Sequence, residues 1–221
     1  MNSNTTQARI GLVFYPGMTA LDVIGPQTVF SALPDVKIHR IWKTADPIRC
    51  DDGMAVTPDT TFADCPPLDV LCVGGGLHQA EIENDREVLD FLARQGKTAR
   101  WVTSVCGGSV LLAKAGLLDG YRAATHWAMR DLLAGLGVEV GTERVVVDRN
   151  RMTGGGVTAG IDFGLAVAAA LRGERAAKLA QLAIEYNPAP PFRAGSPEEA
   201  GPELVAEALA FIATEMGRVP A

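Results

Sequence analysis

The stretch VTSVCGGSVLLA (residues 102–113) holds the strongest single indication of fold and chemistry in this sequence. An apolar, strand-like run leads directly into a helical pattern over 107–116. Gly107 and Gly108 remove the side chains that would block a tight turn, so Cys106 is predicted at the tip of a strand-to-helix elbow. There the free N–H groups and dipole of the helix favour a thiolate. A lone cysteine is more often a buried structural residue, but this position favours a reactive thiol.

Strand-like runs of the same kind lie upstream, at 10–15 and 70–73, besides the one at 101–105. Continuous apolar runs are typical of strands covered on both faces, as in parallel sheets. Helical patterns separate these runs, and Asn84 or Asp85 is expected to cap one of them. The other predicted helices cover 20–32, 107–116, 127–136, 157–171, 174–186 and 198–217. Strands alternating with helices predict an α/β fold with a mostly parallel central sheet and helices on both faces.

The composition is that of an ordinary globular protein. The chain has 221 residues, of which 48% are hydrophobic, and a net charge of −6. We expect a disordered tail over 1–8 and a single domain over 9–221, in which the proline-rich segment 187–197 is a rigid surface loop. The acidic balance argues against nucleic-acid and anionic-membrane partners. No apolar run approaches the roughly 20 residues of a membrane span, and no signal peptide is evident, so a cytoplasmic location is expected.

The cysteines and histidines form no metal signature. No two cysteines have a CxxC spacing, and the three histidines do not complete a ligand set with them. We expect free thiols in a reducing compartment. Apart from Cys106, the cysteines are interpreted as core or loop thiols: Cys50, Cys65 and Cys72.

A glycine triplet, Gly74 to Gly76, follows the apolar run at 70–73. Glycines after a strand let backbone N–H groups point at an anion or a developing oxyanion. A flexible turn is an equally good interpretation. If the 70–73 and 101–105 strands are neighbours, the triplet faces Cys106. A second triplet, at 154–156, is interpreted as a turn, and neither triplet has the GxGxxG pattern of a dinucleotide site.

Three titratable residues are candidates to assist Cys106. Asp22 stands among apolar residues at the start of a predicted helix. It is either a simple charge at a helix N-terminus or a partly buried carboxyl with a raised pKa. His126 is either a base for the thiol or a packed histidine beside Trp127. His78 either reaches the mouth of the pocket or is solvated.

With these residues located, the chain resembles the ThiJ/PfpI superfamily, and within it the bacterial isocyanide hydratase branch. The resemblance runs from about Ile10 to Pro197. Matches to VTSVC alone indicate only the superfamily, whereas the ordered set is specific for the branch. The segments that carry it are LDVIGP (21–26), LPDVKIHRIWK (33–43), TTFADCPPLDVLCVGGG (60–76), VTSVCGGS (102–109), AGLLDG (115–120), ATHWA (124–128), TGGGVTAGIDF (153–163) and EYNPAPPFRAGSP (185–197).

The resemblance implies a flavodoxin-like sandwich with a nucleophile elbow, assembled as a homodimer. It implies that Cys106 is the nucleophile and Asp22 its acid/base partner, and that His126 is not the general base. The implied reaction is the hydration of a small-molecule isocyanide to an N-substituted formamide through a covalent Cys106 thioimidate, with no cofactor and no metal. Backbone N–H groups of Gly75, Gly76 and Gly107 are the expected substrate-binding groups.

The chain departs from the hydratase pattern at Gly107, where that branch has a threonine directly after the nucleophile. Gly74, Leu77 and His78 also stand where the branch has other residues. Three alternatives therefore stay open. One is a cysteine-dependent glyoxalase or amidase-like hydrolase of the same superfamily. Another is a ligand-sensing domain related to AraC-type regulators, which the acidic balance and the absence of a helix-turn-helix extension disfavour. The third is a redox sensor in which Cys106 is oxidised.

Overall fold

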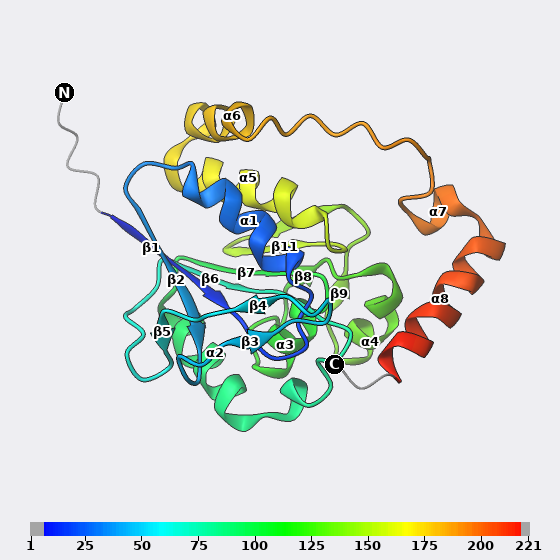
Figure 1. Cartoon of the computed structure of the whole chain (residues 1–221), viewed down its shortest axis with the longest axis horizontal. Helices are drawn as coiled ribbons and strands as arrows, with labels where there is room; N and C mark the ends of the chain where they lie inside the picture. The colour runs from blue at the N-terminus through cyan, green and yellow to red at the C-terminus, as the bar shows by residue number, and fades with distance from the viewer. Residues whose placement is uncertain (1–6, 218–221) are drawn as a thin grey trace.

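The structure, a computed structural model, describes residues 7–217. Within this range seven strands form the main sheet, in the spatial order β10-β11-β7-β6-β1-β2-β5 (Figure 1). The strands are β1 (Ala8–Val13), β2 (Val36–Trp42), β5 (Thr60–Thr61), β6 (Val70–Val73), β7 (Trp101–Val105), β10 (Val145–Asp148) and β11 (Arg151–Gly154). All neighbours pair in parallel except the edge pair β10–β11. The predicted α/β fold with a mostly parallel sheet is confirmed.

The sheet is covered by helices on both faces (Figure 1). One layer holds α1 (Leu21–Ser31), α5 (Ala159–Arg172) and α6 (Glu174–Ala183). The opposite layer holds α2 (Arg86–Thr98) and α3 (Gly108–Lys114), and α4 (Arg130–Gly135) lies beside α3. The central strands β6 and β7 are almost wholly buried, because they are covered on both sides, and this is why their sequences are apolar without alternation.

Helix ends follow the local sequence. Asp85 caps α2, because its Oδ1 accepts hydrogen bonds from the N–H groups of Glu87 (3.1 Å) and Val88 (3.3 Å). The apolar face of α2 then packs into the core. The sequence left Asn84 and Asp85 open as caps, and the structure selects Asp85. The predicted helix over 198–217 is two helices, α7 (Pro197–Ala200) and α8 (Pro202–Met216), separated at Gly201, whose φ of +80° ends α7.

Several short elements complete the fold. A hairpin of β3 (Ile48–Arg49) and β4 (Ala55–Val56) and a pair of β8 (Arg122–Ala123) and β9 (Glu139–Val140) flank the main sheet. The 3-10 helices η1 (Ile82–Asn84) and η2 (Trp127–Met129) precede α2 and α4. Of the predicted tail over 1–8, residues 1–6 lie outside the described residues, and Ala8 already belongs to β1. No helix in the described part of the chain is long and apolar enough to cross a membrane.

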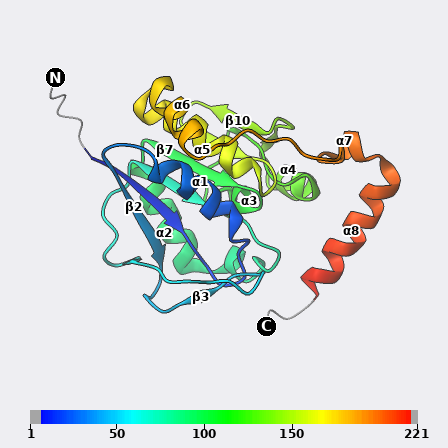
Figure 2. The ribbon, with the colours of Figure 1, turned by 45° about the horizontal axis from the view of Figure 1, so that its top comes forward.

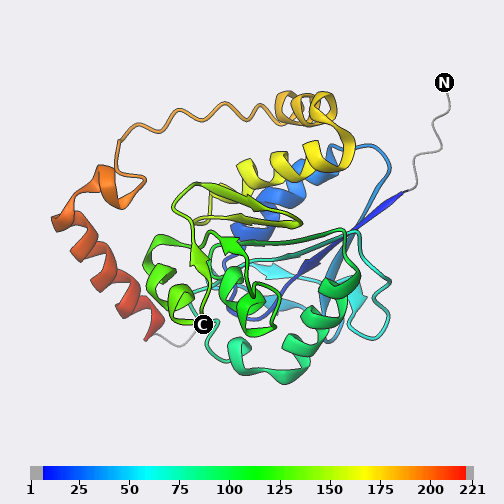
Figure 3. The same cartoon turned by 180° about the vertical axis from the view of Figure 1, so that it is seen from behind.

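The C-terminal helix α8 stands at the edge of the molecule, on the far side of α4 from the sheet (Figures 1 and 3). The extended segment 187–196 leads to it from α6 and contains no helix or strand. Figure 2 shows this segment crossing the outside of the domain. The predicted surface loop is therefore present, and it carries α8 to the carboxyl-terminal side of the sheet, where the strands end in the elbow and the glycine triplet.

Helices α1 and α5 touch through glycine. A Cβ built at Gly164 would lie 3.1 Å from the Cα of Pro26 and 3.2 Å from the Cβ of Val29. We therefore expect Gly164→Val to lower the free energy of unfolding by about 1–3 kcal/mol, because the added carbons force apart two backbones. Urea unfolding measures this. Gly135→Val is the control, since a Cβ at this helical glycine meets no described atom within 4 Å, and an unchanged midpoint for Gly164→Val would contradict the close packing.

Candidate active site

The predicted elbow is present at Cys106. Strand β7 ends at Val105, helix α3 begins at Gly108, and Cys106 between them has a φ of +57°. A non-glycine residue in this left-handed region carries strain that the surrounding structure must offset. Cys106 is 8% exposed, so its side chain lies at the base of a cavity and not on the open surface.

Hydrogen bonds to both peptide groups of Cys106 hold the strained turn. The Cys106 N–H donates to the carbonyls of Gly155 at 2.8 Å and Gly154 at 3.2 Å, and the Thr125 hydroxyl donates to the Cys106 carbonyl at 2.8 Å. Gly155 belongs to the second glycine triplet, which follows β11, the neighbour of β7. The second triplet is therefore a turn with a structural role, because its carbonyls fix the backbone of Cys106.

Asp22 lies in the first turn of α1 and is fully buried. Its Oδ2 accepts a hydrogen bond of 2.7 Å from the N–H of Gly75. Its Oδ1 has no well-aligned hydrogen-bond partner among the described residues. The carboxyl and the thiol of Cys106 nevertheless act on each other's titration, through charge and a marginal hydrogen bond. The carboxyl of Asp22 and the thiol of Cys106 therefore lie close to each other. Of the two interpretations of Asp22, the buried carboxyl is confirmed.

Burial dominates the electrostatics of this pair. It raises the pKa of Asp22 to about 7, although the Gly75 N–H and the Cys106 thiol lower it and the charge of Asp51 raises it further. Burial, and after it the negative charge of Asp22, also raise the pKa of the Cys106 thiol well above its usual value. The N–H groups of Gly107 and Val157 oppose this shift. The expectation that the helix N-terminus leaves a free thiolate is therefore wrong for the resting site: desolvation and Asp22 outweigh it.

The two groups consequently titrate as a unit. Two negative charges side by side in a buried site are costly, so Asp22 and Cys106 hold at least one proton between them near neutral pH. A carboxyl with a pKa near 7 is suited to exchange that proton with a neighbouring thiol, because it is close to balanced between its acid and base forms.

The first glycine triplet packs against the elbow, as the pairing of β6 with β7 requires. A Cβ at Gly75 would lie 2.7 Å from the Cα of Gly107, and one at Gly76 would lie 2.6 Å from the Cα of Met18. Both positions therefore need glycine for close backbone contact. Their N–H groups already have acceptors in the protein, Asp22 for Gly75 and the Gln79 side chain for Gly76, at 2.7 and 3.1 Å. Direct substrate binding by Gly75 and Gly76 stays a prediction.

Cys106 opens into a cavity of about 370 Å³. Its walls come from the ends of several elements and from α8, which supplies Ile212 and Met216. Most of the lining is apolar; its residues are Thr19, Asp51, Gly76, Leu77, Cys106, His126, Ala128, Met129, Leu132, Val157, Ile212 and Met216. A small apolar molecule fits this volume and meets the sulfur at its base.

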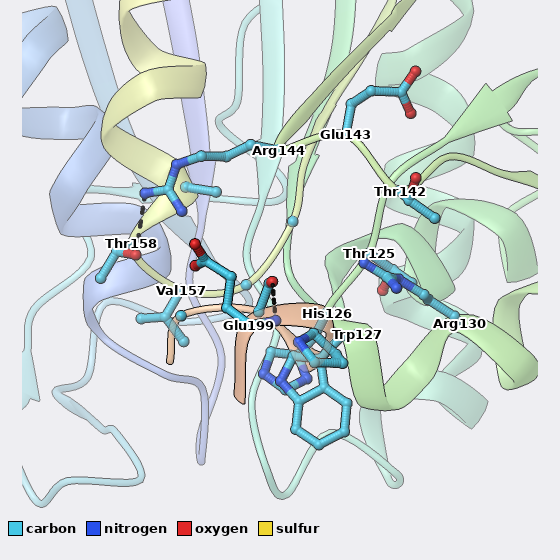
Figure 4. A pocket seen from close by; sticks show the side chains of 16 residues that line it. Thr125, His126, Trp127, Arg130, Thr142, Glu143, Arg144, Val157, Thr158 and Glu199 are labelled. Atoms are coloured by element: carbon cyan, nitrogen blue, oxygen red, sulfur yellow. Dashed lines mark hydrogen bonds between the residues drawn. The ribbon is translucent and has the colours of Figure 1, made fainter. Parts of the chain in front are cut away.

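A second, polar cavity of about 480 Å³ adjoins the first, and His126 and Val157 line both. Figure 4 shows the rings of His126 and Trp127 at one end of it and Arg144 reaching toward Thr158, to which its guanidinium donates at 3.2 Å. Although this cavity is the larger, Cys106 does not line it, whereas Cys106 does line the smaller one. We therefore place the chemistry in the smaller, apolar cavity.

The histidines take subordinate positions. The Nδ1 of His126 accepts a hydrogen bond from the N–H of Ala128 at 3.3 Å and caps η2. Burial, with the charge of Arg130 second, lowers the pKa of His126. It lines both cavities, so it is both packed beside Trp127 and present at the site. His78 is half-buried beside Gly17 and does not line the cavity of Cys106.

Burial raises the pKa of each of the other three thiols, to about 11 for Cys50 and Cys65 and to about 12 for Cys72. All four cysteines are free. In the described part of the chain no group of three or more His, Cys, Asp or Glu side chains could hold a metal ion.

Sequence reasoning missed several residues that complete the site. Asp51, from the β3–β4 hairpin, lines the cavity and accepts a hydrogen bond of 2.5 Å from the Thr19 hydroxyl. The N–H of Val157 points at the sulfur of Cys106. Gln79 is buried at 2% exposure between the two loops. No local pattern marks Asp51, whereas Gln79 lies three residues after the first glycine triplet and Val157 directly follows the second.

An elbow cysteine beside a buried carboxyl, on a parallel sheet with helices on both faces, defines a class of α/β proteins with a cysteine nucleophile. Residues 8–170 match the DJ-1/PfpI family, and the chain belongs to that family. It is 50% identical over 200 residues to the isonitrile hydratase of Pseudomonas putida, which covers 90% of this chain and 88% of that protein. The resemblance drawn from the sequence is confirmed.

Solved structures agree with this placement. A ThiJ/PfpI family protein from Pseudomonas syringae superposes with a TM-score of 0.90 at 44% identity, over 96% of this chain and 88% of that chain. Drosophila melanogaster DJ-1beta superposes with a TM-score of 0.76 at 20% identity, over 83% of this chain and all of that chain, and shows the fold alone. The regulator GbdR of Pseudomonas aeruginosa is 31% identical over 72% of this chain and 46% of its own length.

The buried carboxyl makes stability depend on pH. The pKa of Asp22 is about 7 in the fold, against 3.8 when exposed, so its contribution is complete below pH 4 and is lost as pH rises through 7. Asp22→Asn has no ionisable group at this position, so the variant does not lose this stability as pH rises. We expect the stability of the variant relative to wild type to be greater at pH 8 than at pH 5, by a few kcal/mol at most.

Urea unfolding at the two pH values measures the difference. Asp90→Asn, at an exposed carboxyl on α2, controls for a change in surface charge. An Asp22→Asn curve that runs parallel to wild type across this range would contradict a buried, proton-binding carboxyl.

Proposed function

We propose that the chain is an isocyanide hydratase, which adds water to an isocyanide and releases an N-substituted formamide. The observation that carries the proposal is the contact of the buried Asp22 carboxyl with the thiol of Cys106, which lines an apolar cavity. The 50% identity to the Pseudomonas putida isonitrile hydratase over nearly the whole chain supports it. An isocyanide carbon needs a nucleophile, a proton and a water molecule, and no redox chemistry.

The first step forms a carbon–sulfur bond. Asp22 in its ionised form accepts the thiol proton as the sulfur of Cys106 attacks the terminal carbon of the isocyanide. Neutral Asp22 then returns this proton to the same carbon. The product is a thioimidate, in which the former isocyanide carbon carries one hydrogen, the sulfur and a double bond to nitrogen.

The second step adds water to the thioimidate carbon. Asp22 takes a proton from the water as its oxygen attacks and passes this proton to the nitrogen, whose double bond becomes single. The hydroxyl of the tetrahedral intermediate then gives its proton to Asp22 as the carbonyl forms and the sulfur leaves. Cys106 recovers the proton from the carboxyl, and the net change is one isocyanide plus one water to one formamide. A carboxyl with a pKa near 7 serves both directions of transfer.

Backbone N–H groups stabilise the negative charge on the sulfur of Cys106. The N–H groups of Gly107 and Val157 both favour the charged form of Cys106. One comes from the start of α3 and the other from the loop before α5. We assign the anion-stabilising role to this pair.

The wider setting is proposed on the same basis. The net charge of −6 and the apolar cavity favour a neutral small-molecule substrate over nucleic acid or an anionic membrane surface. We propose a homodimer in the cytoplasm. The exposed apolar side chains of α8 and of α6, among them Phe211 and Leu182, are the kind of surface that a second copy covers.

Formamide production tests the proposal directly. The purified chain should convert simple alkyl isocyanides to formamides, as followed by mass spectrometry, and should leave methylglyoxal unchanged. Cys106→Ala should abolish the reaction with the fold intact, and Asp22→Asn should lower kcat by about 10²- to 10⁴-fold through lost proton transfer. Cys72→Ala, at a thiol buried in β6, is the matched control. Turnover of methylglyoxal alone would transfer the site to the glyoxalase class.

The wall of the cavity should set the size of the substrate. Ile212 and Met216 close the cavity from α8. We expect Ile212→Trp to lower kcat/KM about tenfold or more for a bulky cyclic isocyanide, and much less for a small alkyl one, because the larger side chain fills the space of the substituent. Glu207→Trp, at an exposed polar residue on the same helix that does not line the cavity, is the control. Equal effects on both substrates would show that α8 does not contact the substituent.

A further inference from the structure

Gln79 is a buried amide between the two loops that build the site. It is 2% exposed and follows the first glycine triplet. Its Oε1 accepts a hydrogen bond from the N–H of Gly76 at 3.1 Å, and its Nε2 donates to the carbonyl of Gly107 at 3.2 Å. One side chain therefore joins the glycine triplet after β6 to the turn that carries Cys106.

The remaining hydrogen of that amide is also used. Nε2 donates to Oε1 of Glu83 at 2.9 Å, and Oε2 of Glu83 pairs with the ammonium of Lys114 at 2.8 Å. Lys114 lies in the last turn of α3, the helix that begins beside Cys106. The network therefore runs from one end of α3 through Glu83 and Gln79 back to Gly107 at its other end. An amide held by three bonds in a buried position does not move aside cheaply.

Gly107 is glycine because this amide occupies the space beside it. Its φ of −63° and ψ of −12° are right-handed helical values that any residue adopts, so backbone conformation does not require glycine here. A Cβ at this position would lie 2.9 Å from the Cδ and 3.0 Å from the Nε2 of Gln79, and closer still to its Oε1. Side chains at positions 79 and 107 therefore compete for one volume.

We propose that Gln79 is a positioning residue of the active site, which fixes the turn at Cys106 and Gly107 and excludes any side chain at position 107. The inference deepens the proposed hydratase function. What it predicts for isocyanide turnover rests on that function, whereas what it predicts for the alkylation of Cys106 does not. It predicts that the two positions change together: a side chain at 107 is accepted only when residue 79 is short.

The proposal accounts for the departure at position 107 from the hydratase pattern. Substituting a threonine at Gly107 alone does not restore a hydroxyl to the site, because the new side chain meets the amide of Gln79. In this chain Gln79 holds the turn from the loop opposite. Its effect on the chemistry passes through the N–H of Gly107, which helps to stabilise the charged sulfur.

A double-mutant cycle on Gln79→Ala and Gly107→Ala tests the coupling. The first readout is the pH dependence of Cys106 alkylation by iodoacetamide, located by peptide mass spectrometry, which needs no isocyanide. Gln79→Ala should move the midpoint to higher pH and slow alkylation at pH 7 several-fold. Gly107→Ala alone should disturb the turn and slow alkylation at least tenfold. The double variant should recover most of the loss seen in Gly107→Ala.

The second readout is kcat and KM for an alkyl isocyanide, in which both single variants should lose kcat with little change in KM. Gln79→Glu keeps the volume but not the two donors, so it should fail to rescue Gly107→Ala. If Gly107→Ala does not fold, the comparison of Gln79→Ala with the double variant shows whether a side chain at position 107 is accepted when residue 79 is short.

Two results would overturn the proposal. One is additive effects of the two substitutions. The other is a Gln79→Ala protein that loses thermal stability while its alkylation profile stays that of wild type. A wild-type protein that alkylates as expected but forms no formamide would defeat the hydratase assignment and leave the positioning role standing.

Discussion

The site depends on one backbone angle, the φ of +57° at Cys106. In the extended conformation of β7 the side chain would continue the alternation of the strand and be packed into a helix layer. The left-handed turn directs it instead beyond the end of the sheet, where the loops after β1, β6 and β11 meet. The structure holds this costly conformation with bonds to the Cys106 peptide groups from Gly155 and Thr125. The geometry of the sheet edge thus fixes the position of one sulfur atom.

Around that sulfur, burial shifts the pKa values of Asp22 and Cys106 more than any single charge does. A carboxyl and a thiol in water lose protons about five pH units apart. Here burial raises the pKa of both, and the charge of Asp22 raises that of the thiol further. The Gly75 N–H keeps Asp22 from becoming a permanently neutral acid. The balance leaves a carboxyl that both gives and takes a proton at neutral pH, which is what an addition of water across carbon needs from a single group.

The sequence predicted those parts of the structure that are set by local patterns. The elbow followed from an apolar run that meets two glycines, and the α/β fold from the alternation of strands and helices. The role of Asp22 could not be decided in this way, because it depends on Gly75, which is 53 residues away in the chain. The same holds for Gln79, a polar residue in a loop with no periodic pattern. The thiolate expectation failed because sequence reveals a helix N-terminus but not the depth at which it is buried.

The placement of α8 separates the groups that carry out the chemistry from a part of the wall that shapes the cavity. The sulfur, its carboxyl and its N–H donors all belong to the tightly packed sheet and its loops, whereas part of the cavity wall comes from a helix that follows an extended arm. Substitutions in that helix alter the shape of the chamber without entering the main core, since none of its side chains is fully buried. Natural variation thus has a region in which to retune selectivity for new compounds while the chemistry, and the fold that supports it, stay constant.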